Sequence, residues 1–229
     1  MSKQRNVAIL IFNDVEVLDF CGPFEVFAVT GRKSTPVPFN VYTVAENPGP
    51  VLTWNQMSVN PKYSLRDCPP PDVLVVPGGR GTRSEMTRSA LTDWIRDASA
   101  NAEVVLSVCT GALLLAKAGL LDGLLATTHH AAMDELRSVI APSTTLCPDK
   151  RFVDNGRFVL SGGISAGIDA AFYVVARLLG NDTALETAEH MEYDIKPESL
   201  LAGGTGKGAF KYVGVGSALH DQLKGTGSA

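Results

Sequence analysis

One cysteine of the sequence lies where a nucleophile would be expected. Residues 104–113 indicate a strand, a sharp turn and a helix, with Cys109 at the turn and Gly111 two residues later. This is the layout of a nucleophile elbow, with sulfur in place of a serine oxygen. Such a turn lifts the side chain above the carboxyl ends of the strands, where N–H groups at the helix start would lower the thiol pKa. The N–H of Thr110 would then face charge that develops on a substrate atom.

The alternative is that Cys109 only fills the core, since free cysteine is among the most buried residue types. Cys21, Cys68 and Cys147 have no comparable context, and no two of the four cysteines form a CxxC pair. That spacing favours reduced thiols over a disulfide framework or a zinc site. We therefore predict that Cys109 is the reactive thiol.

A second segment also resembles a nucleophile turn. Residues 163–167 match G-x-S-x-G and follow an expected strand. A serine hydrolase would need an aspartate and a histidine as well, and Asp182 and His190 are the downstream candidates. Both fall in one short helical stretch, without a strand-end loop to carry either. We expect instead that these glycines allow close packing at a helix start.

A nucleophilic thiol needs a group that manages protons, and the loop after the first expected strand offers three carboxylates. Asp14 and Glu16 are expected to face solvent. Asp19 stands between Leu18 and Phe20, before a Gly-Pro pair that is expected to begin a helix. From position alone, Asp19 could serve the thiol or simply cap that helix.

The remaining motifs are weaker. His129 and His130 lie where an expected strand gives way to a helix, and one of them could orient the site or act as a structural donor. No H-E-x-x-H or similar ligand spacing occurs, so we expect no metal. Residues 204–208 resemble a phosphate loop only superficially, because no strand precedes them and no Ser or Thr follows Lys207.

The elements that must position these residues alternate between strand and helix. Strands are expected at 7–11, 39–44, 72–76 and 103–108, with a strand or hairpin at a sheet edge over 51–59 and a hairpin of 151–153 and 157–160. Helices are expected from Gly22-Pro23 to Gly31, at 84–100, 111–118, 131–140 and 164–179, and at 183–192, where Thr183 and Glu186 have capping-box spacing. This alternation predicts an α/β fold with a mostly parallel central sheet and helices on both faces.

Composition and charge limit the class of protein and its possible partners. The 229 residues are 45% hydrophobic and 19% charged, as in an ordinary soluble domain. We expect one catalytic domain over residues 5–195 and a glycine-rich tail over 196–229. A net charge of −4 without a basic patch disfavours nucleic acid as a partner. No apolar run approaches a membrane span, and the short polar start lacks the apolar core of a signal peptide, so the expected location is the cytoplasm.

Four segments together resemble the DJ-1/PfpI superfamily. They are residues 18–27, 76–81, 107–111 and 126–129, and the match continues through 162–169 and Glu192-Tyr193. It therefore spans most of residues 7–195 in the right order. Within the superfamily, the sequence is most similar to the isonitrile (isocyanide) hydratase branch. PfpI-type peptidases place histidine where Thr110 stands, and DJ-1-like members carry glutamate where Asp19 stands, so both residues favour the hydratase pattern.

This resemblance implies a flavodoxin-like three-layer sandwich, usually a homodimer, that acts on a small-molecule isonitrile without a cofactor. Carried over by position, Cys109 is the nucleophile, Asp19 is the acid hydrogen-bonded to it, and the Gly79 N–H and the helix start at Thr110 line the site. Gly79, Arg80 and Ile164 are expected to contact the substrate, and His129 to stand behind the residues that do.

The implied reaction is hydration of an isonitrile to an N-substituted formamide through a thioimidate, with one proton shared between Cys109 and Asp19. Two alternatives remain. One is a DJ-1-like glyoxalase, deglycase or stress-response protein. The other is a non-catalytic ligand-sensing domain, as in AraC-type regulators, which carry helix-turn-helix units after this domain. Only 29 residues follow Leu200, so we expect the enzyme.

Overall fold

A seven-stranded sheet runs through the middle of the molecule, whose computed structural model describes residues 3–195. Its strands in spatial order are β10 (Phe152–Asn155), β11 (Phe158–Ser161), β7 (Val104–Ser107), β6 (Val73–Val76), β1 (Arg5–Leu10), β2 (Phe39–Ala45) and β5 (Tyr63–Ser64). All neighbours are parallel except the hairpin of β10 and β11. Every residue of β6 and β7 is buried, as expected of unbroken apolar runs with both faces covered.

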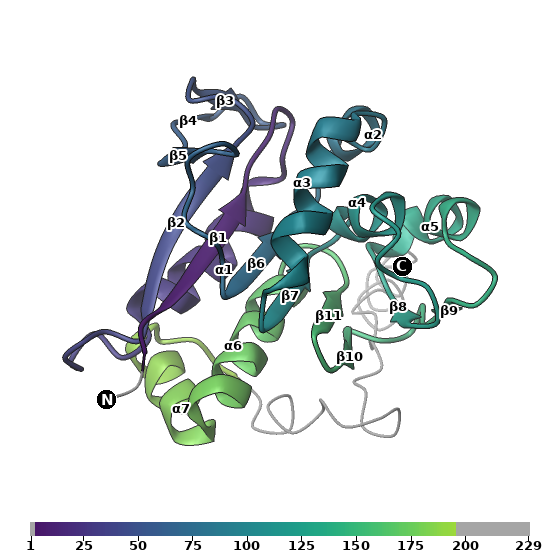
Figure 1. Cartoon of the computed structure of the whole chain (residues 1–229). Helices are drawn as coiled ribbons and strands as arrows, with labels where there is room; N and C mark the ends of the chain where they lie inside the picture. The colour runs from purple at the N-terminus through teal and green to yellow at the C-terminus, as the bar shows by residue number, and fades with distance from the viewer. Residues whose placement is uncertain (1–2, 196–229) are drawn as a thin grey trace, which may run out of the picture.

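Helices cover both faces of this sheet (Figure 1). One layer holds α1 (Val17–Val29), α6 (Ala166–Leu179) and α7 (Asn181–His190), which pack on one another. The other holds α2 (Thr82–Glu85), α3 (Ser89–Ala100), α4 (Gly111–Lys117), the short η1 (His130–Ala132) and α5 (Met133–Val139). The predicted α/β fold is confirmed: a mostly parallel sheet between two helical layers, as in a flavodoxin-like sandwich.

The strand order creates a crevice beside β1. From β1 the chain crosses to β2 on one side and later to β6 on the other, so the loops after β1 and β6 diverge at the carboxyl ends of the strands. In open parallel sheets, ligands bind at such a switch point. The loops after β1, β6 and β7 are therefore the ones that the fold brings to a site.

The first helix differs from its prediction. It begins at Val17 rather than at Gly22-Pro23, and Pro23 lies inside it. A contact distant in sequence fixes this start: the N–H of Glu16 donates to the carbonyl of Gly78 at 3.0 Å. The helix therefore begins where the loop after β1 meets the loop after β6, which places Asp19 in its first turn.

Three other predictions also need correction. The helix expected over 84–100 is two helices, α2 and α3, because Arg88 between them is extended (φ −100°, ψ 107°). The last helix begins directly after Gly180, so Thr183 does not form a capping box; its Oγ1 instead donates to the carbonyl of Leu179 at 3.2 Å. The segment over 51–59 is a hairpin of β3 (Val51–Leu52) and β4 (Ser58–Val59), but it forms its own small sheet.

A further two-stranded sheet joins β8 (Leu125–Ala126) and β9 (Thr145–Leu146) beside the main one. Within residues 3–195, no helix is both long and apolar enough to cross a membrane. The predicted glycine-rich tail lies outside the described residues.

Candidate active site

A cavity of about 690 Å³ opens at the carboxyl ends of β1, β6 and β7. Of the residues predicted for the site, Cys109, Thr110, Gly79, Arg80, Ile164 and His129 line this cavity. Asp19 lies behind its wall, fully buried. The cavity thus occupies the switch point of the sheet, and the fold brings the predicted residues to one place.

Cys109 occupies a strained turn between β7 and α4. Its φ of 56° is left-handed, a conformation that costs a non-glycine residue on the order of 1–3 kcal/mol. Two contacts hold it: its N–H donates to the carbonyl of Gly162 at 3.0 Å, and its carbonyl accepts the Thr128 hydroxyl at 2.7 Å. A Cβ at Gly111 would approach the carbonyl oxygen of Val76 to 2.0 Å, so only glycine fits after the turn.

Two backbone N–H groups favour the ionised sulfur, but burial outweighs them. The N–H groups of Thr110 and Ile164 both lower the pKa of the Cys109 thiol. Burial, followed by the negative charge of Asp19, raises that pKa to about 12. The lowered pKa that the elbow predicts is therefore wrong in direction, because the side chain is only 6% exposed. The thiol needs a neighbouring base to become a nucleophile.

Asp19 is placed to be that base. Its Oδ2 accepts the N–H of Gly78 at 3.0 Å, while its Oδ1 is buried without a hydrogen-bond partner among the described residues. Burial raises the pKa of this carboxyl to about 7, against the opposing effect of the Gly78 N–H, and the charge of Glu16 raises it further. The interaction with the Cys109 thiol lowers it. Each of the two side chains therefore shifts the pKa of the other.

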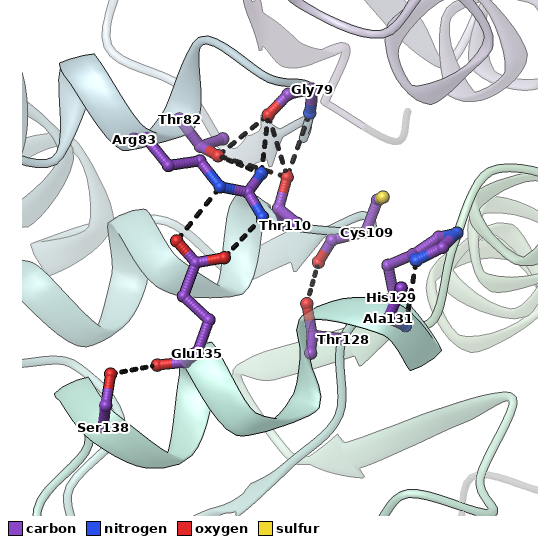
Figure 2. A network of polar contacts seen from close by, with 10 residues as sticks. All are labelled: Gly79, Thr82, Arg83, Cys109, Thr110, Thr128, His129, Ala131, Glu135 and Ser138. Atoms are coloured by element: carbon purple, nitrogen blue, oxygen red, sulfur yellow. Dashed lines mark hydrogen bonds and ion pairs between the residues drawn. The ribbon is translucent and has the colours of Figure 1, made fainter.

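The loop after β6 is fixed by a network that the sequence did not reveal (Figure 2). The carbonyl of Gly79 accepts the hydroxyls of Thr82 at 2.8 Å and Thr110 at 3.1 Å. Arg83 donates to the same carbonyl and forms a bidentate ion pair with Glu135 of α5. The N–H of Gly79 donates to the Thr110 hydroxyl at 3.0 Å. Gly79 thus lines the cavity while its N–H is bonded to the turn at Thr110.

His129 faces the cavity as a neutral ring. Its Nδ1 accepts the N–H of Ala131 at 3.2 Å, so the proton of the neutral imidazole is on Nε2. Burial is the first cause that lowers the pKa of His129, and the neighbouring His130 and Arg83 add to it. In residues 3–195, no group of three or more His, Cys, Asp or Glu side chains is arranged to hold a metal ion.

Asp14 and Glu16 do not simply face solvent as predicted. Both line the cavity at its mouth, beside the β3–β4 hairpin. Asp14 has a left-handed φ of 60°, and the bridge between Val15 and Gly79 holds this stretch against the loop after β6. The tertiary bridge, which has no local sequence signal, accounts for this difference.

The G-x-S-x-G segment does not form a serine site. The left-handed residue of that turn is Ile164, with φ 51°, and not Ser165. The exposed Ser165 hydroxyl accepts a hydrogen bond from Arg151 at 3.3 Å. Asp182 and His190, the other candidates for a triad, both belong to α7, as predicted.

Known proteins match most of the chain. The model of the DJ-1/PfpI family matches residues 5–177. The chain is 38% identical to isonitrile hydratase of Pseudomonas putida over 192 residues, which cover 83% of this chain and 79% of that protein. It is 29% identical to the HTH-type transcriptional regulator CdhR of Pseudomonas aeruginosa over 79% of this chain, and spans 52% of that regulator. The crystal structure of a THiJ/PfpI family protein from Pseudomonas syringae superposes with a TM-score of 0.76 at 28% identity, covering 86% of this chain and 78% of that one.

Proposed function

The chain belongs to the DJ-1/PfpI family, and on that premise we propose that it is a cysteine-dependent isonitrile hydratase, a hydro-lyase that makes N-substituted formamides. The observation that carries this proposal is the pairing of the Cys109 thiol, on a strained turn, with the buried Asp19 carboxyl. The 38% identity to isonitrile hydratase supports the class of substrate.

In the first step, the thiol adds to the isonitrile carbon. That carbon becomes electrophilic as it is protonated, so attack and proton delivery belong together. The Asp19 carboxylate accepts the thiol proton and passes it to the carbon, while the sulfur of Cys109 forms a bond to the same carbon. The product is an N-substituted thioimidate on Cys109, and Asp19 is again a carboxylate.

In the second step, water releases the product. Asp19 accepts a proton from water as the hydroxyl adds to the thioimidate carbon, and it passes that proton to the nitrogen. The carbon–sulfur bond then breaks, the proton of the added hydroxyl passes to the Cys109–Asp19 pair, and an N-substituted formamide is left. The sum is one isonitrile and one water consumed for one formamide formed, without any redox change.

Negative charge develops on sulfur at two moments, before attack and on release. The N–H groups of Thr110 and Ile164 favour the charged sulfur at both. The turns that carry them are joined by the hydrogen bond from the Cys109 N–H to the Gly162 carbonyl, so little reorganisation is needed when the charge appears. This preorganisation supports a role for the turn at Ile164 in rate rather than in binding alone.

The direct test is to supply the purified protein with an isonitrile and to follow the formamide by proton NMR. We expect catalytic formation of the formamide, complete loss in Cys109→Ala, and a thioimidate adduct on Cys109 by intact-protein mass spectrometry. Methylglyoxal, assayed in parallel, separates the hydratase from a DJ-1-like glyoxalase. Consumption of methylglyoxal without any formamide would contradict the proposal.

A ligand-sensing role is the second candidate, and the similarity to CdhR supports it. This role requires binding of an isonitrile or another small molecule without turnover. Saturable binding by calorimetry together with an absence of formamide would favour it over the hydratase.

We also propose a homodimer, which the superfamily resemblance implies. Light scattering at micromolar concentration should give a mass near twice the 24.3 kDa of the chain. A mass of one chain would contradict the dimer and leave the proposed chemistry standing.

A further inference from the structure

Trp54 has an unusual position for a tryptophan. It lies in the turn of the β3–β4 hairpin, is 41% exposed, and lines the cavity that contains Cys109. Tryptophan is highly buried on average, so such exposure calls for a reason. Leu52 and Met57 of the same hairpin are as exposed, yet neither is among the residues that line the cavity. The indole is thus the large apolar side chain that the hairpin contributes to the cavity wall.

The exposure of Trp54 does not come from a loose hairpin. The backbone N–H of Trp54 donates to the carbonyl of Val15 at 3.0 Å, and the backbone N–H of Asp14 donates to the carbonyl of Leu52 at 2.8 Å. Thr53, beside Trp54, is fully buried. These bonds fasten the hairpin to the loop after β1, the loop that leads into α1 and Asp19. The backbone at Trp54 is therefore held at a fixed place relative to the reacting groups.

The neighbouring guanidinium extends this surface. Arg80 lies over the Trp54 ring, with its guanidinium carbon 4.6 Å from the ring centroid, a cation–π contact. Arg80 also lines the cavity, and it forms no ion pair with any residue in the described part of the chain. Indole and guanidinium together form a flat, polarisable patch in the wall.

The charges of the lining do not select an ionic substrate. The carboxylates of Asp14 and Glu16 and the guanidinium groups of Arg80 and Arg83 all line the cavity, so charges of both signs occur side by side there. A planar uncharged group gains most from such a wall, since aromatic faces attract one another beyond the burial of area alone.

We infer that Trp54 determines the substrate specificity of this site, and that its indole binds the N-substituent of an isonitrile with an uncharged aromatic substituent. This inference rests on the proposed hydratase function. Binding to the indole is the same in the ground state and the transition state, because the substituent does not react. Its loss therefore raises KM and leaves kcat in place.

The test compares phenyl isonitrile with methyl isonitrile, which carries no group to stack. In Trp54→Leu, we expect KM for phenyl isonitrile to rise about tenfold with kcat within about twofold, and both constants for methyl isonitrile to stay within about twofold. Trp54→Phe keeps an aromatic face and should lose no more than about threefold. Met57→Ala, on the same hairpin but outside the cavity wall, is the matched control and should change neither KM nor kcat for either isonitrile. Trp54→Gln is a second non-aromatic variant should Trp54→Leu fail to fold.

The outcomes distinguish a failure of the role of Trp54 from a failure of the proposed hydratase function. Equal losses for both isonitriles, or an unchanged KM for phenyl isonitrile in the non-aromatic variants, would overturn the role of Trp54 and leave the hydratase standing. A wild-type protein that converts neither isonitrile would overturn the proposed function, and this inference with it.

Discussion

Two neighbouring strand-to-helix turns build the site, and they do so in opposite ways. Strands β7 and β11 are adjacent and parallel, and each is followed by a non-glycine residue with left-handed φ: Cys109 at 56° and Ile164 at 51°. The first turn places the side chain of Cys109 in the cavity wall. The second directs a backbone N–H toward the sulfur of the first and leaves Ser165 outside. The same backbone conformation thus positions the proposed nucleophile at one strand and a hydrogen-bond donor at the next.

The strain in the two turns has a common support. A left-handed non-glycine residue persists only where its surroundings determine it, because it costs on the order of 1–3 kcal/mol. Here the turns hold each other, since the N–H of Cys109 donates to Gly162, two residues before Ile164. The contacts of Gly111 with Val76 and of Gly167 with Val108 close the packing from both sides. A change in either turn is therefore expected to be felt in the other.

The largest expected difference between the turns concerns their reactive side chains. Cys109→Ala should lower isonitrile turnover by at least about a thousandfold, because the atom that forms the covalent bond is gone. Ser165→Ala should keep turnover within about twofold, because its hydroxyl contacts only Arg151 at the surface. Formamide release measured by NMR checks both. An active Cys109→Ala protein would contradict the assignment of Cys109 as the nucleophile. An inactive but folded Ser165→Ala protein would show that the second turn takes part in turnover through its serine.

The glycines of the two turns should differ next. A Cβ at Gly111 would meet the backbone oxygen of Val76 at 2.0 Å, inside a central strand that has no room to move. A Cβ at Gly163 would meet Cδ2 of His129 at 2.1 Å, in a half-buried side chain that can move at the cost of its hydrogen bond from Ala131. We expect Gly111→Ala to lower the free energy of unfolding by at least about 3 kcal/mol, and Gly163→Ala by about 1 kcal/mol. Urea unfolding measures both, and equal losses would show that the second turn is as tightly packed as the first.

Much of this arrangement was predictable from sequence, for a physical reason. Buried parallel strands such as β6 and β7 are unbroken apolar runs, and a cysteine before a glycine at the end of such a run indicates an elbow. Both signals are local. The start of α1 is not, because it depends on the contact of Glu16 with Gly78, 62 residues apart in the chain. The Gly22-Pro23 pair therefore misled the prediction.

The unpredicted parts of the site are backbone and tertiary features. The direction of the Ile164 N–H follows from a φ that glycine would normally adopt, and no side-chain pattern marks it. Trp54 reaches the cavity because its hairpin is bonded to the loop after β1. The pKa of Cys109 is raised because burial outweighs the N–H groups at the helix start. Those N–H groups were the reason for predicting a lowered pKa from the sequence.

A pH profile separates the turns by the group that titrates at each. The proposed base at the first turn is Asp19, whose pKa is raised to about 7, chiefly by burial. The titratable side chain against the second turn is His129, whose pKa is lowered from 6.5. Because Asp19 must be ionised to accept the thiol proton, kcat/KM should fall about tenfold per unit below pH 7 and level off above it.

The matched control for this profile is His129→Gln, which should leave the inflection near pH 7. Rates of formamide release between pH 5 and 9 give the curve. An inflection well below 6.5 that disappears in His129→Gln would assign proton transfer to the second turn instead.

The last comparison concerns substitutions of the Asp19 carboxylate itself. Asp19→Asn removes the transferable proton, and Asp19→Glu moves the carboxyl by about one methylene toward the reacting atoms, so each should lose at least about tenfold in turnover, or about 1.4 kcal/mol.

The stability of Asp19→Asn separates the role of a base from that of a helix cap. Since the folded pKa of about 7 lies above the ordinary 3.8, the stability that Asp19 contributes is present below pH 3.8 and is lost as the pH rises through 7. Asp19→Asn should therefore raise the unfolding temperature at pH 8 relative to wild type, with less gain at pH 5. A capping carboxylate has the opposite sign, because its pKa is lowered by the helix start and its removal destabilises the fold at pH 8. An Asp19→Asn protein with full turnover and a lower unfolding temperature at pH 8 would leave Cys109 without its base and reduce the first turn to a structural one.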